Sequence, residues 1–493
     1  MNPTLGAAST SNAPKICGSC GGGHIALATR RQPVRRSVRI TGAYLSTALQ
    51  PEDPAPRGSS RMRRYTRCIY AFFMTVSTGL VLAGAAALGA YEAGVLRYLV
   101  EKVAPELGKK RLFDVVSGTS AGALNAMAFA AFADHPGNGV ARTCAAWQAM
   151  RLGQVLKPSA IELLLSLIEA TPVSARLPRA VLARRAHGGL LDPRPIMDVL
   201  ATALPVERIE GHLARGLLHG VAISATHVAT GHAAVFYQTH RPTLPWRTEP
   251  TAMVVPTRIQ LAHAMASAAI PLLLPPVKIA ADLYCDGGLR QMVPLSPSIH
   301  LGANRLLVIN PLAPFGSIGQ QQRTHAPVSS SPLYLGGKAL NALFVDRTEV
   351  DLARLEQLSA VLRAGRRCFG AGFDAALNAE LARAGAAPLR EVTALRIGPS
   401  VDLSRLASEY IASSEFARRE RGLVARMIRW VAEAGAEKTG DLLSYILFDG
   451  GFASALIAQG MADASRRHAE LCAMFVDDRD EEDAWRSASS AGN

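Results

Sequence analysis

The sequence feature that most restricts the possible folds is a glycine-rich turn between a predicted strand and a predicted helix. Residues 113–117 (FDVVS) are a short apolar run that suits a buried strand, and residues 121–131 are small, apolar and typical of a helix. Gly118-Thr-Ser120-Ala-Gly122 joins them. Glycines at both ends permit a turn tight enough to lift the serine hydroxyl clear of the sheet. The pattern predicts Ser120 as a nucleophile, with helix N–H groups directed at developing negative charge, although a chance glycine-rich turn is the alternative.

The chain up to about residue 310 alternates between strands and helices. Beyond the elements around Ser120, strands are predicted at 78–82, 221–225, 233–237 and 305–309, and a helix at 90–103. This alternation indicates an α/β fold with a mainly parallel sheet. From about residue 335 onward the pattern is almost entirely helical.

The composition predicts four segments. Residues 1–60 lack periodicity and are rich in Gly, Ser, Pro, Ala and Arg, which is typical of disorder, and Met62 and Met74 are alternative starts. The expected segments are a disordered or mis-assigned extension (1–75), an α/β domain (76–315) with a helical insertion (155–215), a helical C-terminal region (316–476) and an acidic tail (477–493).

The positive charge is unevenly distributed. The chain of 493 residues has a formal charge of +14, and residues 1–75 contain eleven basic and two acidic residues. The globular part is therefore only mildly basic, which argues against nucleic acid as a partner and suits an anionic lipid surface.

The seven cysteines are scattered and odd in number, which argues against a disulfide framework. Cys17 and Cys20 form a Cys-x-x-Cys pair near His24, but no second pair completes a zinc site. We therefore expect no metal site and no cofactor.

A serine nucleophile needs a base, and the residues alone leave two kinds of candidate. Histidines after Ser120 are plentiful and none lies in a compelling loop; they include His227, His232, His240, His263, His300 and His325. Asp286, followed by Gly287 and Gly288, marks a sharp turn at the end of a predicted strand, although Asp-Gly turns are common.

The combination of motifs resembles the patatin-like phospholipases. A small-residue loop follows the first strand, Gly-Thr-Ser-Ala-Gly comes next, and Asp-Gly-Gly follows about 165 residues later. Three further segments are similar to family segments: 225–231 (ATHVATG), 266–271 (ASAAIP) and 284–295 (YCDGGLRQMVPL). The resemblance covers about residues 78–310, and the helical remainder resembles bacterial members less specifically.

The resemblance implies a three-layer α/β/α fold and a Ser120–Asp286 catalytic dyad without a histidine. It implies a lipid acyl hydrolase of the phospholipase A or lysophospholipase type, acting through an acyl-enzyme on a phospholipid or other lipid ester at a membrane surface. The expected location is the cytoplasm or the membrane periphery of a bacterium, with non-classical secretion as an alternative. Protein partners are not indicated.

The predicted oxyanion loop departs from the family pattern G-G-G-x-[RK]-G. The matching positions are Gly84, Ala85, Ala86, Ala87, Leu88 and Gly89, and the N–H of Ala121 after the nucleophile is a further donor. If Ala85 or Ala86 needs a positive φ, alanine there costs roughly 1–2 kcal/mol. The loop therefore predicts reduced activity, and a lipid-binding protein without catalysis is the alternative function.

Residues 68–90 also permit a different interpretation, because they are about long enough for a signal peptide or membrane anchor and follow a cluster of arginines. The segment contains Thr75, Ser77, Thr78 and several glycines, so it is weakly hydrophobic. Signal cleavage after its small residues would destroy the loop that an acyl hydrolase needs. We favour a strand, a loop and a helix here.

Overall fold

The computed structural model describes residues 76–152, 204–244, 246, 252–271, 273–312, 332–384, 386–422, 425–426, 428–429 and 443–476, with side chains from residue 350 onward in the helix that begins at 332. The N-terminal extension, most of the predicted insertion 155–215 and the acidic tail lie outside the described residues. The predicted segment boundaries therefore stay predictions.

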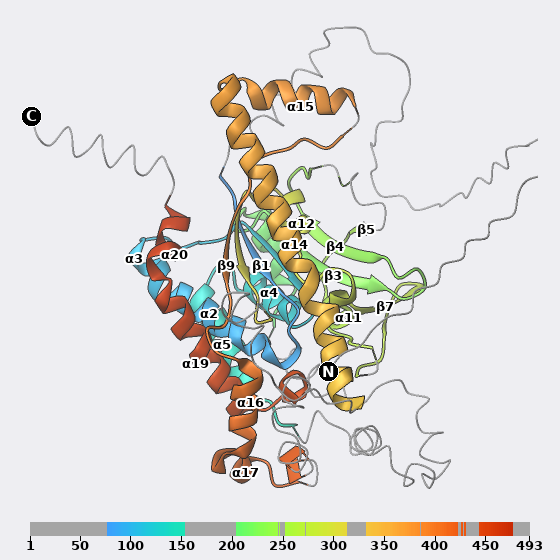
Figure 1. Ribbon diagram of the computed structural model, residues 1–493, viewed down its shortest axis with the longest axis vertical. Helices are drawn as coiled ribbons and strands as arrows, with labels where there is room; N and C mark the ends of the chain where they lie inside the picture. The colour runs from blue at the N-terminus through green and yellow to red at the C-terminus, as the bar shows by residue number, and fades with distance from the viewer. Residues whose placement is uncertain are drawn as a thin grey trace, which may run out of the picture. The chain divides into compact units, whose positions relative to one another are not determined.

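Five parallel strands form the centre of a nine-stranded sheet (Figure 1). Their order across the sheet is β3 (Gly220–His227), β2 (Val115–Thr119), β1 (Thr78–Leu82), β8 (Arg305–Ile309) and β9 (Thr393–Ile397). Strands β1, β2 and β3 are buried along their whole length. This explains why they read as continuous apolar runs rather than as alternating patterns.

Four further strands extend the sheet beside β3. Strand β4 (Ala233–Thr239) pairs with β3 antiparallel, and β5 (Ala252–Pro256) pairs with β4 parallel. On the other side of β3, its last three residues pass the end of β2 and pair antiparallel with β7 (Asp282–Asp286), which forms a hairpin with β6 (Val277–Ile279). This overhang of β3 positions the functional site.

Helices cover both faces of the sheet, which gives the expected three layers (Figure 1). Leu80 and Leu82 of β1 point into the larger hydrophobic cluster, and Val81 points into the cluster on the opposite face. The first face carries α2 (Gly89–Tyr98), α4 (Ala121–Ala131), α5 (Pro136–Ala149), α10 (Arg208–Ala214) and α11 (Leu261–Ser267), and the second carries α12 (Leu295–His300) and α14 (Pro332–Phe369).

The described chain contains further helices and helical turns. They are the 3₁₀ turns η1 (Ala86–Leu88) and η5 (Gly287–Leu289), the π-helical turn η2 (Leu99–Val103), and the helices α3 (Ala104–Glu106), α15 (Phe373–Arg383), α16 (Leu403–Ala412), α17 (Ser414–Arg419), α19 (Gly450–Arg466) and α20 (His468–Phe475).

Residues 68–90, which the sequence alone allows to be either a membrane segment or part of the fold, belong from residue 78 onward to a strand, a short turn and the start of a helix. Residues 68–75 lie outside the described part of the chain. Across the part that is described, none of the helices combines the length and the apolar character that crossing a membrane requires.

The C-terminal region is mainly helical, as expected, but it also contributes β9 to the sheet. Strand β9 lies beside β8 at one edge, and only its last residue, Ile397, is buried. A half-exposed edge strand of five residues has no continuous apolar run, so the sequence pattern did not reveal it. The region is therefore part of the α/β fold and not merely an addition to it.

Helix α19 packs closely against α2, near the start of the fold. A Cβ atom at Gly94 would overlap the backbone of Ile457, and one at Gly460 would overlap the carbonyl oxygen of Tyr91. The Tyr91 hydroxyl also donates a hydrogen bond to Oδ2 of Asp463 at 3.0 Å. The two helix backbones therefore touch directly, and their glycines make this approach possible.

We expect Gly94→Ala to destabilise the protein by about 1–3 kcal/mol, because the new methyl group forces the α2 and α19 backbones apart. Gly211→Ala in α10 is the matched control, since a Cβ there meets nothing within 4 Å. Alanine at that helical position should be neutral or stabilise by about 0.5–1 kcal/mol. Urea unfolding measures both, and equal stability of the two variants would contradict the described contact between α2 and α19.

Candidate active site

Ser120 lies on the tight turn between β2 and α4. Its backbone has φ 54° and ψ −125°, a conformation that non-glycine residues rarely adopt. A Cβ at Gly118 would overlap the backbone of Gly122, and a Cβ at Gly122 would overlap the carbonyl groups of Leu82 and Ala83. The two motif glycines are therefore needed because the turn packs directly against its own helix and against the end of β1.

The structure brings the two predicted catalytic residues together. The Ser120 hydroxyl donates a hydrogen bond of 2.6 Å to Oδ2 of Asp286, and the two residues are 3% and 1% exposed. Thr119, the last residue of β2, pairs with Ser224 of β3, and the next residue of β3 pairs with Asp286. Strand β7 thus lies in line with β2, beyond the end of β2, and this places the Asp286 carboxylate next to Ser120.

Backbone and hydroxyl groups hold Asp286 in place. The N–H of Gly288 donates to Oδ1 at 2.7 Å, the Asp286 N–H donates to Ala269 at 2.9 Å, and the Thr226 hydroxyl donates to the Asp286 carbonyl at 2.8 Å. Burial raises the pKa of Asp286 to about 6, although the hydrogen bonds from Ser120 and Gly288 partly oppose this. A carboxylate with this pKa is a stronger base than an ordinary aspartate and is still ionised at neutral pH.

A third side chain positions the nucleophile from the backbone side. The N–H of Ser120 donates to the hydroxyl of Ser267 at 2.8 Å, and that hydroxyl donates to the carbonyl of Ser224 at 2.5 Å. Sequence reasoning assigned no role to Ser267 or Thr226. Both lie in the segments 266–271 and 225–231, which resemble the family, and this was the available signal.

The predicted oxyanion loop lies directly against the nucleophile. A Cβ at Gly84 would lie 3.2 Å from Cβ of Ser120. The N–H of Gly84 donates to the Met292 carbonyl at 2.9 Å, whereas the described residues provide no hydrogen-bond acceptor for the N–H groups of Ala85 and Ala86. Ala85 has φ −153° and Ala86 has φ 48°. Ala86 is therefore the alanine that occupies a left-handed conformation.

Helix α4 places another N–H beside this loop. Ala121 is its first residue, and the first N–H groups of an α-helix have no partner within the helix. The loop and the start of α4 therefore offer N–H groups from two directions next to Ser120. Leu88, which stands where the family carries a basic residue, is buried in the core and supplies no charge.

A buried polar cluster lies behind the loop, where α2 begins. The Asn125 amide donates to the Gly89 carbonyl at 2.9 Å and to Oε2 of Glu92 at 2.8 Å, and its oxygen accepts from Nε1 of Trp147 at 3.0 Å. Burial raises the pKa of the Glu92 carboxyl well above its usual value, although the hydrogen bond from Asn125 partly opposes this. The cluster ties α2, α4 and α5 together directly behind the loop.

The described histidines interact elsewhere. His227 bonds to Thr230, His240 to Glu210, His263 to the backbone of Gln260, and His300 to Ser296, while the side chain of His300 also stacks on Trp246. His232 is only partly buried, and His325 lies outside the described residues. The hydroxyl of Ser120 instead has Asp286 as its partner.

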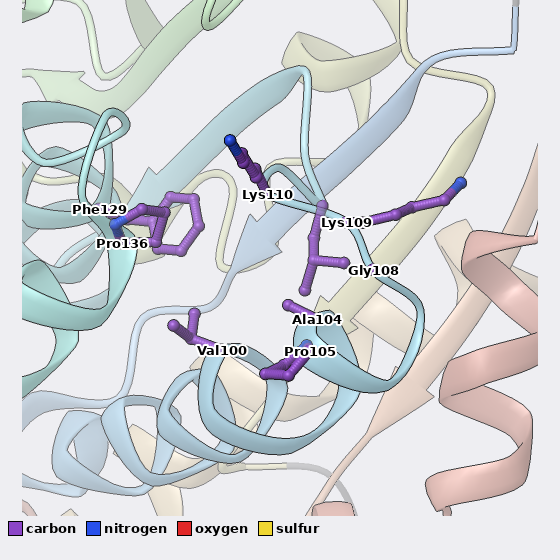
Figure 2. A pocket seen from close by; sticks show the side chains of 9 residues that line it. Val100, Ala104, Pro105, Gly108, Lys109, Lys110, Phe129 and Pro136 are labelled. Carbon is purple, nitrogen blue, oxygen red and sulfur yellow. The ribbon is translucent and has the colours of Figure 1, made fainter.

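One surface pocket lies away from the dyad. Figure 2 shows this cavity of about 260 Å³, formed beside η2 and α3 and by the segment that precedes β2. Its lining includes Val100, Pro105, Lys110, Leu112 and Phe129. Leu112 precedes β2 whereas Ser120 follows it, so the pocket and the dyad lie at opposite ends of that strand.

Comparison with known proteins identifies the domain. Residues 80–299 match the sequence profile of the family described as patatin-like phospholipase. The mainly parallel sheet, with helices on both faces, agrees with this fold class. This part of the chain is therefore a patatin-like phospholipase domain.

Two solved structures show a weak likeness. VipD from Legionella pneumophila is 12% identical with a TM-score of 0.25, over 81% of this chain and 92% of that chain. ExoU from Pseudomonas aeruginosa, solved in complex with SpcU of its type III secretion system, is 16% identical with a TM-score of 0.21, over 80% and 76%. No curated protein matches the chain.

We expect Ala86→Gly to stabilise the protein by about 0.5–1 kcal/mol. Relief of the left-handed strain stabilises the folded state by about 1–2 kcal/mol. Glycine also increases the conformational entropy of the unfolded chain, which offsets part of this gain. Ala85→Gly is the matched control, because φ at this position is negative and glycine should destabilise by about 0.5–1 kcal/mol. Thermal and urea unfolding measure both, and an unstrained Ala86 would make the two variants equally unstable.

Proposed function

We propose that the protein hydrolyses carboxylic esters of a phospholipid, as a phospholipase A or lysophospholipase, through an acyl-enzyme formed on Ser120. The observation that carries this proposal is the 2.6 Å hydrogen bond from the Ser120 hydroxyl to a buried Asp286 carboxylate with a raised pKa. A nucleophile within hydrogen-bond reach of a base that the fold holds in place is the arrangement that covalent ester hydrolysis needs.

In the first half-reaction, Ser120 passes its proton to Asp286 as its oxygen bonds to the ester carbonyl carbon. The carbonyl oxygen becomes an oxyanion, for which the N–H groups of Ala85, Ala86 and Ala121 are the donors in our proposal. When the intermediate collapses, the bond to the alcohol breaks and the departing alcohol takes the proton from Asp286. The acyl group stays on Ser120.

In the second half-reaction, Asp286 removes a proton from water, whose oxygen bonds to the acyl carbon. The bond between that carbon and the serine oxygen then breaks, and the serine oxygen regains the proton. The products are a fatty acid and the free enzyme. No histidine is needed, because one carboxylate accepts and returns the proton in both halves.

A second candidate function is lipid binding without turnover. It is favoured by the loop, where the N–H of Gly84 is bonded to the Met292 carbonyl and Ala86 is strained. One oxyanion donor is typically worth about 3–4 kcal/mol of barrier, so a small displacement of Ala85 or Ala86 would greatly slow the reaction. Binding to phospholipid vesicles by Ser120→Ala, together with an inert wild type, would favour this candidate.

The proposed site of action is a membrane surface in the cytoplasm or at the membrane periphery of a bacterium. Support comes from the mildly basic charge of the chain after residue 75, which favours contact with anionic lipid. No protein partner is proposed.

We expect a fluorophosphonate probe to label the wild type but not Ser120→Ala, because the probe bonds to the activated serine oxygen. Asp286→Asn should label about 10²–10⁴ times more slowly, the range typical of a lost general base. Ser408→Ala, on α16, is the matched control and should label normally, since its hydroxyl only bonds to the Ser404 carbonyl. Labelling that survives in Ser120→Ala would refute the assignment.

We expect the labelling rate to increase with pH through about 6 and then to level off. The base works when it is ionised, and burial places the pKa of Asp286 at about 6. Near pH 5 about a tenth of the carboxyl groups are ionised, so the rate should be about tenfold below its plateau. A rate that stays constant between about pH 5 and pH 8 would exclude Asp286 as the titrating base.

A further inference from the structure

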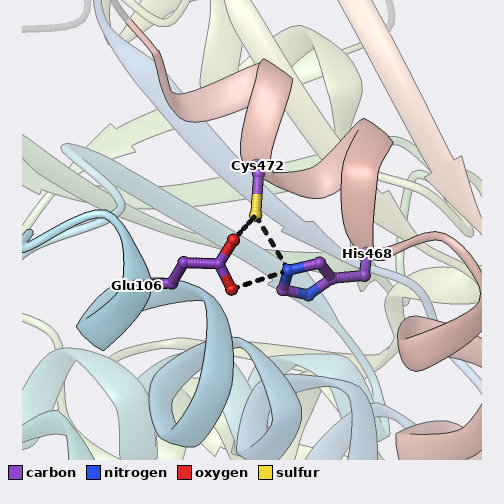
Figure 3. Close-up of side chains that lie close together, drawn as sticks. All are labelled: Glu106, His468 and Cys472. Atoms are coloured by element: carbon purple, nitrogen blue, oxygen red, sulfur yellow. Dashed lines mark hydrogen bonds and ion pairs between the residues drawn. The ribbon is translucent and has the colours of Figure 1, made fainter.

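Three metal-ligating side chains converge where the C-terminal helix α20 meets α3. Nε2 of His468 lies 2.8 Å from Oε2 of Glu106 and 3.3 Å from Sγ of Cys472, and that sulfur lies 3.8 Å from Oε1 of Glu106 (Figure 3). Within the described ranges, this is the one group of three such residues whose ligand atoms all lie within 4.8 Å of one another. Its members belong to two elements that are more than 360 residues apart in the sequence.

The spacing of the three ligand atoms suits a tetrahedral ion. Zinc bonds of about 2.3 Å to sulfur and about 2.0–2.2 Å to nitrogen and oxygen place neighbouring tetrahedral ligands about 3.4–3.6 Å apart. Nε2 of His468 and Sγ of Cys472 lie 3.3 Å apart, close to this spacing, and the Glu106 carboxylate places Oε2 2.8 Å from that nitrogen and Oε1 3.8 Å from that sulfur. Rotations of the exposed Glu106 and the half-buried Cys472 would be enough to enclose an ion.

The imidazole ring is already oriented as a metal ligand. Its other nitrogen, Nδ1, lies 3.1 Å from the hydroxyl of Tyr98, and the Tyr98 ring meets it edge-on. A hydrogen bond at the second ring nitrogen fixes the direction of the ligating nitrogen in metal sites. This contact presents Nε2 to the carboxylate and the thiol.

The π-helical turn η2 explains how Tyr98 and Glu106 come to face the same histidine. They are eight positions apart in the sequence, which in a regular α-helix would leave the two side chains about 80° apart around the axis. A π turn contains an extra residue and brings them back towards one face. Such turns occur frequently at functional sites.

We propose that Glu106, His468 and Cys472 bind a zinc ion that clamps α20 onto the α/β domain, with water as the fourth ligand. Thiolate and imidazole ligands favour zinc over calcium and magnesium. On binding, the Cys472 thiol loses its proton to solvent, and the thiolate, the carboxylate and the divalent ion then sum to zero charge. The clamp would strengthen a docking that already includes a hydrogen bond from Arg305 to the Val476 carbonyl at 2.7 Å.

The sequence alone predicts no metal site, because the Cys17 and Cys20 pair has no second pair to complete it. His468 and Cys472 are spaced i and i+4 on one helix, and Glu106 joins them only through the tertiary fold. The proposal is independent of the Ser120–Asp286 chemistry, and its test does not measure ester hydrolysis.

The experiment titrates zinc and cobalt into the metal-free, full-length protein carrying Cys17→Ser and Cys20→Ser, which removes the competing pair. We expect one equivalent to bind, with the visible bands of tetrahedral cobalt and a thiolate-to-cobalt charge-transfer band in the near ultraviolet. Zinc should raise Tm by several degrees, because it binds the folded state. Absence of binding, or binding without the charge-transfer band, would overturn the proposal.

Cys472→Ser in that background keeps the size of the side chain and should lose both the band and the Tm increase. Two matched controls should keep both the band and the Tm increase. They are Cys368→Ser, which removes an exposed thiol, and His240→Ala, which removes a histidine that lies 2.9 Å from a glutamate, as His468 lies close to Glu106. If Cys472→Ser does not fold in the absence of metal, Glu106→Gln takes its place. Unchanged binding by the folded variant would overturn the proposal.

Discussion

The different lengths of two neighbouring strands create the candidate site. Strand β2 ends at Thr119, while β3 continues past it and leaves its free edge open on that side. Strand β7 pairs with this free edge and ends at Asp286, directly beyond the turn that carries Ser120. The hydrogen bond between the two residues is therefore a consequence of strand register, and any shift of β7 along β3 would separate them.

Two buried carboxyl groups near the site have raised pKa values, because burial outweighs the hydrogen bonds that each of them accepts. Asp286 accepts hydrogen bonds from the Ser120 hydroxyl and the Gly288 N–H, so burial raises its pKa only to about 6. For Glu92, hydrogen bonds from Asn125 and from the backbone at Ala83 also oppose the effect of burial, which still keeps its pKa well above the usual range. Both folded-state pKa values exceed the unfolded ones, so both groups favour folding at low pH, and this contribution is lost as pH increases. Ionisation of Asp286 therefore lowers the stability of the folded protein and at the same time produces the carboxylate that acts as the base.

The elements that could be predicted from the sequence are those formed by residues that are close together along the chain. The run from β2 through Ser120 to α4 is continuous, so its strand, turn and helix were predicted within two residues. The Asp-Gly-Gly turn alone was ambiguous, because only the antiparallel pairing of β7 brings Asp286 to the serine, and the family resemblance supplied that link. Ser267 and the Glu106 cluster were missed, since their partners come from distant segments and no local pattern records such contacts.

The site depends on parts of the chain outside the matched family range of 80–299. Strand β8 begins at Arg305 and lies beside β1, and its Ile309 carbonyl accepts the Ala83 N–H at 3.1 Å, one residue before the oxyanion loop. Helix α19 then packs on α2, which begins where that loop ends. Both ends of the loop are thus fixed by contacts to residues beyond 299. The C-terminal region therefore helps to set the geometry of the loop, in addition to covering the fold.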